Sequence, residues 1–135
     1  MTALTKDRNT KSREGQQFRD PVAAGAKIFA GALVVIAASG FAAPGSTATG
    51  LRARGVAQAQ VDNTSGANGA LDIDTERGCF PFENSAGADE ITRADIGNQA
   101  YIVDDQTVAK TSATNTRSVA GIIRDVTVDG VWVEI

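Results

Sequence analysis

The sequence predicts a mainly β protein, built as a small β-barrel or sandwich with one short helix and an extended N-terminal arm. Glycine occurs 14 times among many Ser, Thr, Asn and Asp residues, which favours frequent turns over long helices. Short apolar or alternating runs, about eight in all, follow one another at the close spacing typical of such folds. A chain of 135 residues has room for one domain, so we assign residues 1–20 to the arm and residues 21–135 to a β-rich domain.

The first 20 residues combine dense charge with no apolar period, which predicts an arm that is disordered alone and orders on a surface. They carry five basic and three acidic residues, a net charge of +2, whereas the rest of the chain carries −5. The sequence leaves open whether this arm stays solvated or docks on an acidic protein surface. In the docked case Arg8, Lys11, Arg13 and Arg19 would pair with acidic groups, and Phe18 would be the apolar anchor. The acidic body argues against nucleic acid as a partner, because phosphate contacts need a concentrated basic face.

The most apolar stretch, residues 28–38, allows two interpretations. It has the outline of a secretory signal segment that would cover residues 1–43 and be cleaved near Ala43. The long, partly acidic region before it and the interruption at Gly31 favour short strands instead. We expect these strands at residues 27–29 and 32–36. At 11 residues the stretch is too short to span a bilayer as a helix, so we expect no membrane partner.

Further strands are expected wherever short apolar or alternating runs are bounded by turn residues. These runs are residues 41–43, 50–59, 71–76, 78–82, 101–103, 107–109, 119–126 and 131–135. Pro81 cannot donate a hydrogen bond to a neighbouring strand, so it predicts an edge or a bulge. In residues 50–59, Leu51 and Ala53 alternate with Arg52 and Arg54, and we expect both arginines on an exposed strand face.

One short helix is expected at residues 92–96. Thr92 with Asp95 three residues later resembles a capping box, and Gly97 supplies a stop signal. The predicted helix is about one turn long.

Asp129-Gly130 is the strongest hairpin signal in the chain. A two-residue turn there requires positive φ, which glycine accepts. Its register would point Val131, Val133 and Ile135 to one face of the last strand and Trp132 to the other.

No residue pattern predicts catalysis, a metal site or a cofactor. The chain has no histidine, so the commonest general base and metal ligand is absent. Cys79 is the single cysteine, which excludes a disulfide within the chain, and we expect it to be a small buried hydrophobe. The carboxylates of residues 72–76 fit a solvated strand face better than a cation site, and Asp104-Asp105 fits an Asx-type turn.

Three blocks in the C-terminal half carry a more specific pattern. They are residues 94–108 (ADIGNQAYIVDDQTV), residues 120–123 (AGII) and residues 130–135 (GVWVEI). In order and spacing they resemble the head decoration (capsid cement) proteins of tailed bacteriophages, especially the Mu-like ones. Residues 21–43 and 50–59 look like the paired opening strands of that family, so the resemblance leaves only the arm uncovered.

This resemblance implies a β-barrel-like domain that assembles as a homotrimer on the outside of the phage head. There it would bind the major capsid protein, stabilise the shell against the pressure of packaged DNA, and catalyse nothing. The sequence itself also suggests assembly, because its few large apolar residues make a thin core. We expect Phe80, Phe82 and Trp132 in the core or a subunit interface, with Trp132 buried in the assembly. The alternative is a secreted or surface-anchored β module that binds a partner and has residues 1–43 as its signal segment.

Overall fold

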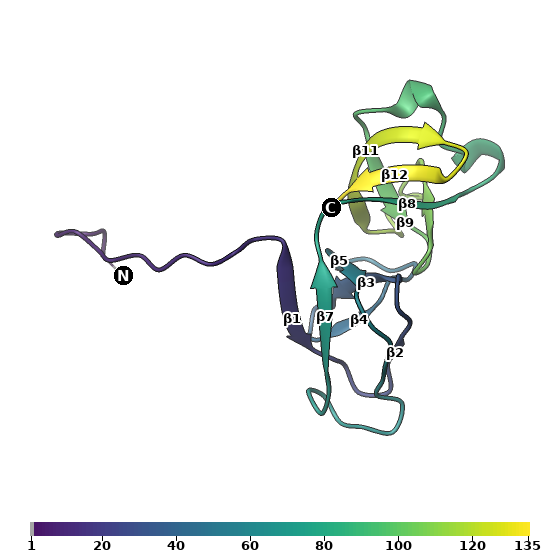
Figure 1. Ribbon diagram of the computed structural model, residues 1–135. Coiled ribbons are helices and arrows are strands. Elements are labelled where there is room, and N and C mark those ends of the chain that lie inside the picture. The colour runs from purple at the N-terminus through teal and green to yellow at the C-terminus, as the bar shows by residue number, and fades with distance from the viewer. Residues whose placement is uncertain (1) are drawn as a thin grey trace.

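The computed structural model describes residues 2–135 and is mainly β, as the sequence predicts. Figure 1 shows two lobes and an extended N-terminal segment that projects from the first of them. The first lobe contains β1 (Gln17–Pro21), β2 (Lys27–Ile28), β3 (Leu33–Ile36), β4 (Ala42–Pro44), β5 (Arg52–Ala57), β6 (Val61–Asp62) and β7 (Asp72–Glu76). The second lobe contains β8 (Cys79–Asn84), β9 (Gln99–Ile102), β10 (Thr107–Ala109), β11 (Val119–Thr127), β12 (Gly130–Glu134) and two short 3₁₀ helices, η1 (Gly87–Asp89) and η2 (Arg93–Asp95).

The first lobe is a five-stranded antiparallel sheet in the order β1-β7-β5-β3-β4, with β2 and β6 paired beside it. The sheet curls until its two ends meet. Val22, directly after β1, forms a parallel bridge with Ala42 of β4, and the Ala23 amide donates to the Ala42 carbonyl across 2.9 Å. The residues that directly follow the edge strand β1 therefore bond to β4, the strand at the opposite edge of the sheet.

The second lobe is a closed five-stranded barrel in the order β10-β8-β12-β11-β9. Its strands pair antiparallel, except that β8 and β10 run parallel. Pro81 of β8 lies opposite Trp132 of β12, and β10 joins β8 only from Glu83 onward. Pro81 therefore lies where β8 is paired on one side only, which agrees with the predicted edge position.

Strand β3 links the two lobes by supplying side chains to both of their cores. The barrel core includes Leu33, Val35, Phe82, Ile91, Ala100, Ile102, Val108, Ala120, Ile123, Val131 and Val133. The other core includes Val22, Ile28, Ala32, Val34, Ala42, Ala57 and Ile73. Because successive side chains of a strand point to opposite faces, Leu33 and Val35 enter the barrel core while Val34 enters the other. The molecule therefore has two small cores rather than the single thin core suggested by the composition.

Most of the predicted elements are present. Each predicted strand has a counterpart, and the consecutive runs at residues 71–76 and 78–82 form β7 of the first lobe and β8 of the barrel. The expected helix is the single turn η2, and the Thr92 amide donates to the Asp95 carboxylate across 2.8 Å in a capping box. The Asx-type turn is also confirmed, since the Gln106 amide donates to Asp104 Oδ1 across 2.9 Å.

The boundary of the arm differs from the prediction. Residues 17–20, which we assigned to the arm, belong to β1 and pair with β7 along its whole length. The extended segment that lies outside the sheet is therefore residues 2–16. Backbone hydrogen bonds to a strand more than 50 residues away hold β1, and a mostly polar run such as Gln17–Pro21 carries no local sign of them.

The C-terminal hairpin forms, but its turn lies one residue earlier than expected. Thr127 pairs with Gly130, so the turn residues are Val128 and Asp129. Gly130 is the first residue of β12, with φ of 130°, and a Cβ added there would lie 2.4 Å from the Phe82 carbonyl oxygen. Glycine is required at position 130 by this close approach to β8 as well as by its positive φ. The predicted facing is confirmed, with Val131 and Val133 fully buried.

Candidate interaction surface

The N-terminal segment, residues 2–16, is exposed along its whole length and extends away from the first lobe (Figure 1). It carries the cations Lys6, Arg8 and Lys11, none of which forms an ion pair in the part of the chain that the structure describes. Leu4 near its tip is 73% exposed. An extended segment with one exposed apolar side chain and several unpaired cationic side chains is suited to binding an acidic protein surface.

The end of this segment nearest the body is held by its own side chains. The Glu14 carboxylate accepts the amide hydrogens of Gln16 and Gln17, the latter across 2.8 Å. The Arg13 guanidinium lies 5.3 Å from the centre of the Phe18 ring. Arg13, Glu14 and Gln16 thus have contacts that link this end of the segment to β1.

Phe18 and Asp20 of β1 meet Arg54 of β5. The Arg54 guanidinium lies 3.7 Å from the centre of the Phe18 ring and binds the Asp20 carboxylate with two hydrogen bonds, of 2.7 and 3.1 Å. The Arg54 and Asp20 side chains are only 27% and 16% exposed. Water screens this bidentate, largely shielded pair less than it screens an exposed ion pair. It contradicts the expectation that Arg54 lies on an exposed strand face.

Arg19 also has partners within its own chain. Its guanidinium lies 3.4 Å from the Asp72 carboxylate and 3.2 Å from that of Asp74, both on the neighbouring strand β7. All three side chains are well exposed, so these pairs contribute little to stability. Of the five residues expected to face a partner, Arg8 and Lys11 are free, whereas Arg13, Phe18 and Arg19 make intramolecular contacts.

No protein-family model, curated protein or solved structure matches the chain. None of these comparisons bears on the resemblance to phage head decoration proteins, which stays a prediction. The three blocks of the C-terminal half that carry it cover β9, β12 and parts of η2, β10 and β11, all of them in the second lobe.

The three aromatic residues expected in the core or an interface lie on two paired barrel strands. Phe82 of β8 is buried in the barrel core, and Phe80 is half-buried against it. Trp132 of β12 points to the other face, where it is half-buried and its indole N–H donates to Thr127 Oγ1 across 2.9 Å. The single chain thus leaves part of the Trp132 ring uncovered, and its burial in an assembly stays a prediction.

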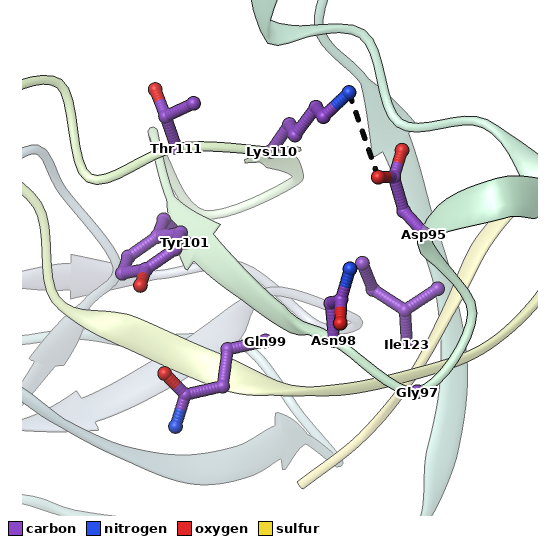
Figure 2. Close-up of a pocket in the computed structure, with 8 residues that line it drawn as sticks. All are labelled: Asp95, Gly97, Asn98, Gln99, Tyr101, Lys110, Thr111 and Ile123. Carbon is purple, nitrogen blue, oxygen red and sulfur yellow. Dashed lines mark ion pairs between the residues drawn. The ribbon is translucent and has the colours of Figure 1, made fainter.

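A polar groove lies beside η2, between β9 and the segment after β10 (Figure 2). Lys110 Nζ lies 3.6 Å from the Asp95 carboxylate at one side, and Tyr101 lies at the other. The hydrogen bond from the Thr92 amide, and then the Lys110 ammonium, hold the pKa of Asp95 below its ordinary value of 3.8. The carboxylate therefore stays ionised at neutral pH, which suits a structural ion pair better than proton transfer.

Cys79 is exposed at the start of β8, not buried as expected. Partial desolvation, and then the nearby Glu134 carboxylate, raise the pKa of its thiol. The thiol is thus protonated at neutral pH and is a weak nucleophile. Residues 2–135 contain no cluster of His, Cys, Asp or Glu suited to a metal ion, and no helix among them is long and apolar enough to cross a membrane.

Sequence reasoning missed the Asp20–Arg54 pair. The two residues are separated by 34 positions, so no local motif joins them. The sequence does contain one indication of this pair. Side chains alternate along the polar strand β1, and Phe18 and Asp20 are the two that face inward.

Proposed function

We propose that the chain is a structural virion protein that binds the outside of a phage head and stabilises the shell against the pressure of packaged DNA. Its direct partner is the major capsid protein, its location is the exterior of the head, and it acts by binding alone. The motif resemblance supplies the family. The observation that carries the proposal is the N-terminal segment, which presents free cations and an exposed leucine at a distance from a folded body.

The body is suited to a rigid role. Two cores and a closed barrel give it a defined shape, and its net charge of −5 would repel packaged DNA rather than bind it. A cationic segment on an acidic body can join the body to an acidic protein surface without bringing the two acidic surfaces into contact.

We further propose that the protein acts as a homotrimer, with the partly uncovered face of Trp132 at a subunit contact. A half-exposed tryptophan is a common anchor of protein interfaces. Analytical ultracentrifugation of the full chain, free and attached to heads, should give three copies per unit. A monomer in both states would contradict this part of the proposal.

The function is tested with heads of the parent phage made with and without the protein. Heads that lack it should release their DNA at a lower temperature, and adding the purified full chain back should restore the difference. A cryo-EM map of the restored heads should show the two-lobed body on the outer surface. Equal DNA retention together with an outer surface free of the body would overturn the proposal.

The alternative, a secreted or surface-anchored module, would lose residues 1–43 on cleavage. That segment holds β1, β2, β3 and most of β4, including Leu33, Val34 and Val35 of the two cores. Cleavage would therefore remove the centre of the first lobe and one side of the barrel core. Mass spectrometry of the protein from its native source decides between the two functions: an N-terminus before residue 17 supports the virion role, and one near Ala43 supports secretion.

A further inference from the structure

We infer that Arg54 is a positioning residue: with Phe18 and Asp20 it forms a rigid mount that fixes the direction in which the N-terminal segment leaves the body. This inference rests on the proposed function, in which that segment attaches the protein to its partner. It divides the extended segment into two parts. Residues 13–16 belong to the mount, and residues 2–12 are the part that binds.

The geometry of Arg54 carries this assignment. One guanidinium makes two different contacts with the same strand: it stacks on the Phe18 ring at 3.7 Å and forms the bidentate pair with Asp20. A planar guanidinium can make both contacts at once, whereas a lysine ammonium can make neither in the same way. Phe18 lies opposite Thr75 and Asp20 opposite Ile73 in the sheet, so both point to the face that holds the core of the first lobe.

The mount reaches beyond β1 into the segment itself. Arg13 lies on the ring that Arg54 stacks against, and Glu14 accepts the amide hydrogens of Gln16 and of Gln17, the first residue of β1. Arg13, Glu14 and Gln16 are thereby connected to the strand. A segment that is already directed loses less conformational entropy when it binds, so the mount strengthens attachment without touching the partner.

The same contacts define what the partner meets. Arg13, Arg19 and Arg54 are engaged within the chain, so the cations of the N-terminal segment that remain available to a partner are Lys6, Arg8 and Lys11. Leu4 is the exposed large apolar side chain of this segment. The complementary surface on the partner is therefore acidic, with an apolar depression for one leucine.

The test compares Arg54→Ala with Arg52→Ala, a matched control on the same strand whose side chain is exposed and makes no ion pair in the described chain. The first readout is the backbone ¹⁵N heteronuclear NOE of the free full-length protein, which needs no partner. In the wild type and in Arg52→Ala, residues 13–16 should be as rigid as β1 while residues 2–11 are mobile. In Arg54→Ala, residues 13–15 should become more mobile, because the Phe18 ring on which Arg13 lies loses the Arg54 guanidinium. Gln16 should stay rigid, because its carbonyl accepts the Arg77 amide hydrogen across 2.7 Å.

The second readout is binding of the same variants to heads that lack the protein. Arg54→Ala should bind about tenfold more weakly than the wild type, and Arg52→Ala should bind equally well. If Arg54→Ala also loosens β1, Arg54→Lys keeps the charge and the stem, and should still release residues 13–15 because it lacks the planar fork. Mobile residues 13–16 in the wild type, or equal effects of the variants at positions 52 and 54, would overturn the inference. Rigid residues 13–16 together with no binding of the wild type to heads would instead overturn the proposed function.

Discussion

Gly130 shows how a single residue determines the packing of two barrel strands. Its φ is positive, and the Phe82 carbonyl occupies the place of a side chain. We expect Gly130→Ala to lower the free energy of unfolding by about 2 kcal/mol, because the new methyl group must push β12 away from β8.

Urea denaturation followed by circular dichroism measures this change. Gly15→Ala is the control, since a Cβ added at Gly15 meets no atom within 4 Å. It should alter stability by less than about 0.5 kcal/mol. Equal stability of the two variants would show that the close approach of β12 to β8 is not needed.

Asp95 predicts a specific response to acid. Its folded pKa lies below 3.8, chiefly because its carboxylate accepts the Thr92 amide hydrogen and secondly because Lys110 is near. A carboxyl group with a depressed folded pKa stabilises the protein fully above its unfolded pKa, and this contribution disappears as the pH falls through the folded value. The stability difference between wild type and Asp95→Asn should therefore shrink between about pH 5 and pH 2. Urea unfolding at several pH values measures it, and a constant difference would refute this role for Asp95.

Trp132 is the only tryptophan, so its fluorescence reports on one site. In the single chain the ring is half-buried and bonded to Thr127. If a neighbouring subunit covers it, the emission maximum should shift to shorter wavelength and acrylamide quenching should fall when the protein assembles. An unchanged spectrum in the assembled state would place Trp132 outside the interface.

The environments of Asp95 and Trp132 could be predicted from the sequence, whereas that of Arg54 could not, for physical reasons. The capping box of Asp95 and the alternation around Trp132 depend on residues a few positions apart, which a sequence displays. Arg54 looked exposed because its strand alternates, yet Gly55 beside it, with φ of 154°, sits at an irregularity in the pairing with β3. A break of this kind changes which way the neighbouring side chains point.

At the scale of elements, short strands were predictable and their partners were not. Runs such as Leu33–Ile36 are apolar and bounded by turns, so their existence follows from local patterning. Strand β1 contains one apolar side chain, Phe18, and depends on β7 for its hydrogen bonds. The position of residues 71–76 and 78–82 in different lobes is likewise a tertiary property, because two consecutive short runs give no sign of a change of sheet.

Two deletions distinguish the contribution of the N-terminal segment to stability from that of strand β1. Removal of residues 2–12 should leave the free energy of unfolding within about 0.5 kcal/mol of the wild type, because these residues lie outside the sheet. Removal of residues 2–20 should lower it by about 3 kcal/mol or more, since Arg54 loses its carboxylate and β7 loses its neighbour. Thermal and urea unfolding of both variants measure this. Equal stability would mean that β1 contributes nothing to the fold.

At the scale of the whole molecule, the shared strand β3 couples the stability of one lobe to that of the other. Loss of the first lobe would withdraw Leu33 and Val35 from the barrel core, and loss of the barrel would expose them on the sheet. Burying these two side chains contributes on the order of 2 kcal/mol each. Unfolding of either lobe alone therefore loses this burial free energy, which disfavours independent unfolding of the lobes.

The consequence is that two lobes with separate cores should behave as one cooperative folding unit. Trp132 and Tyr101 both lie in the barrel, so near-ultraviolet and fluorescence signals follow that lobe, whereas far-ultraviolet circular dichroism follows both. The transitions seen by these probes should coincide, with a calorimetric enthalpy equal to the van't Hoff enthalpy. In the proposed role on a phage head, this coupling would mean that neither lobe opens under load while the other remains folded.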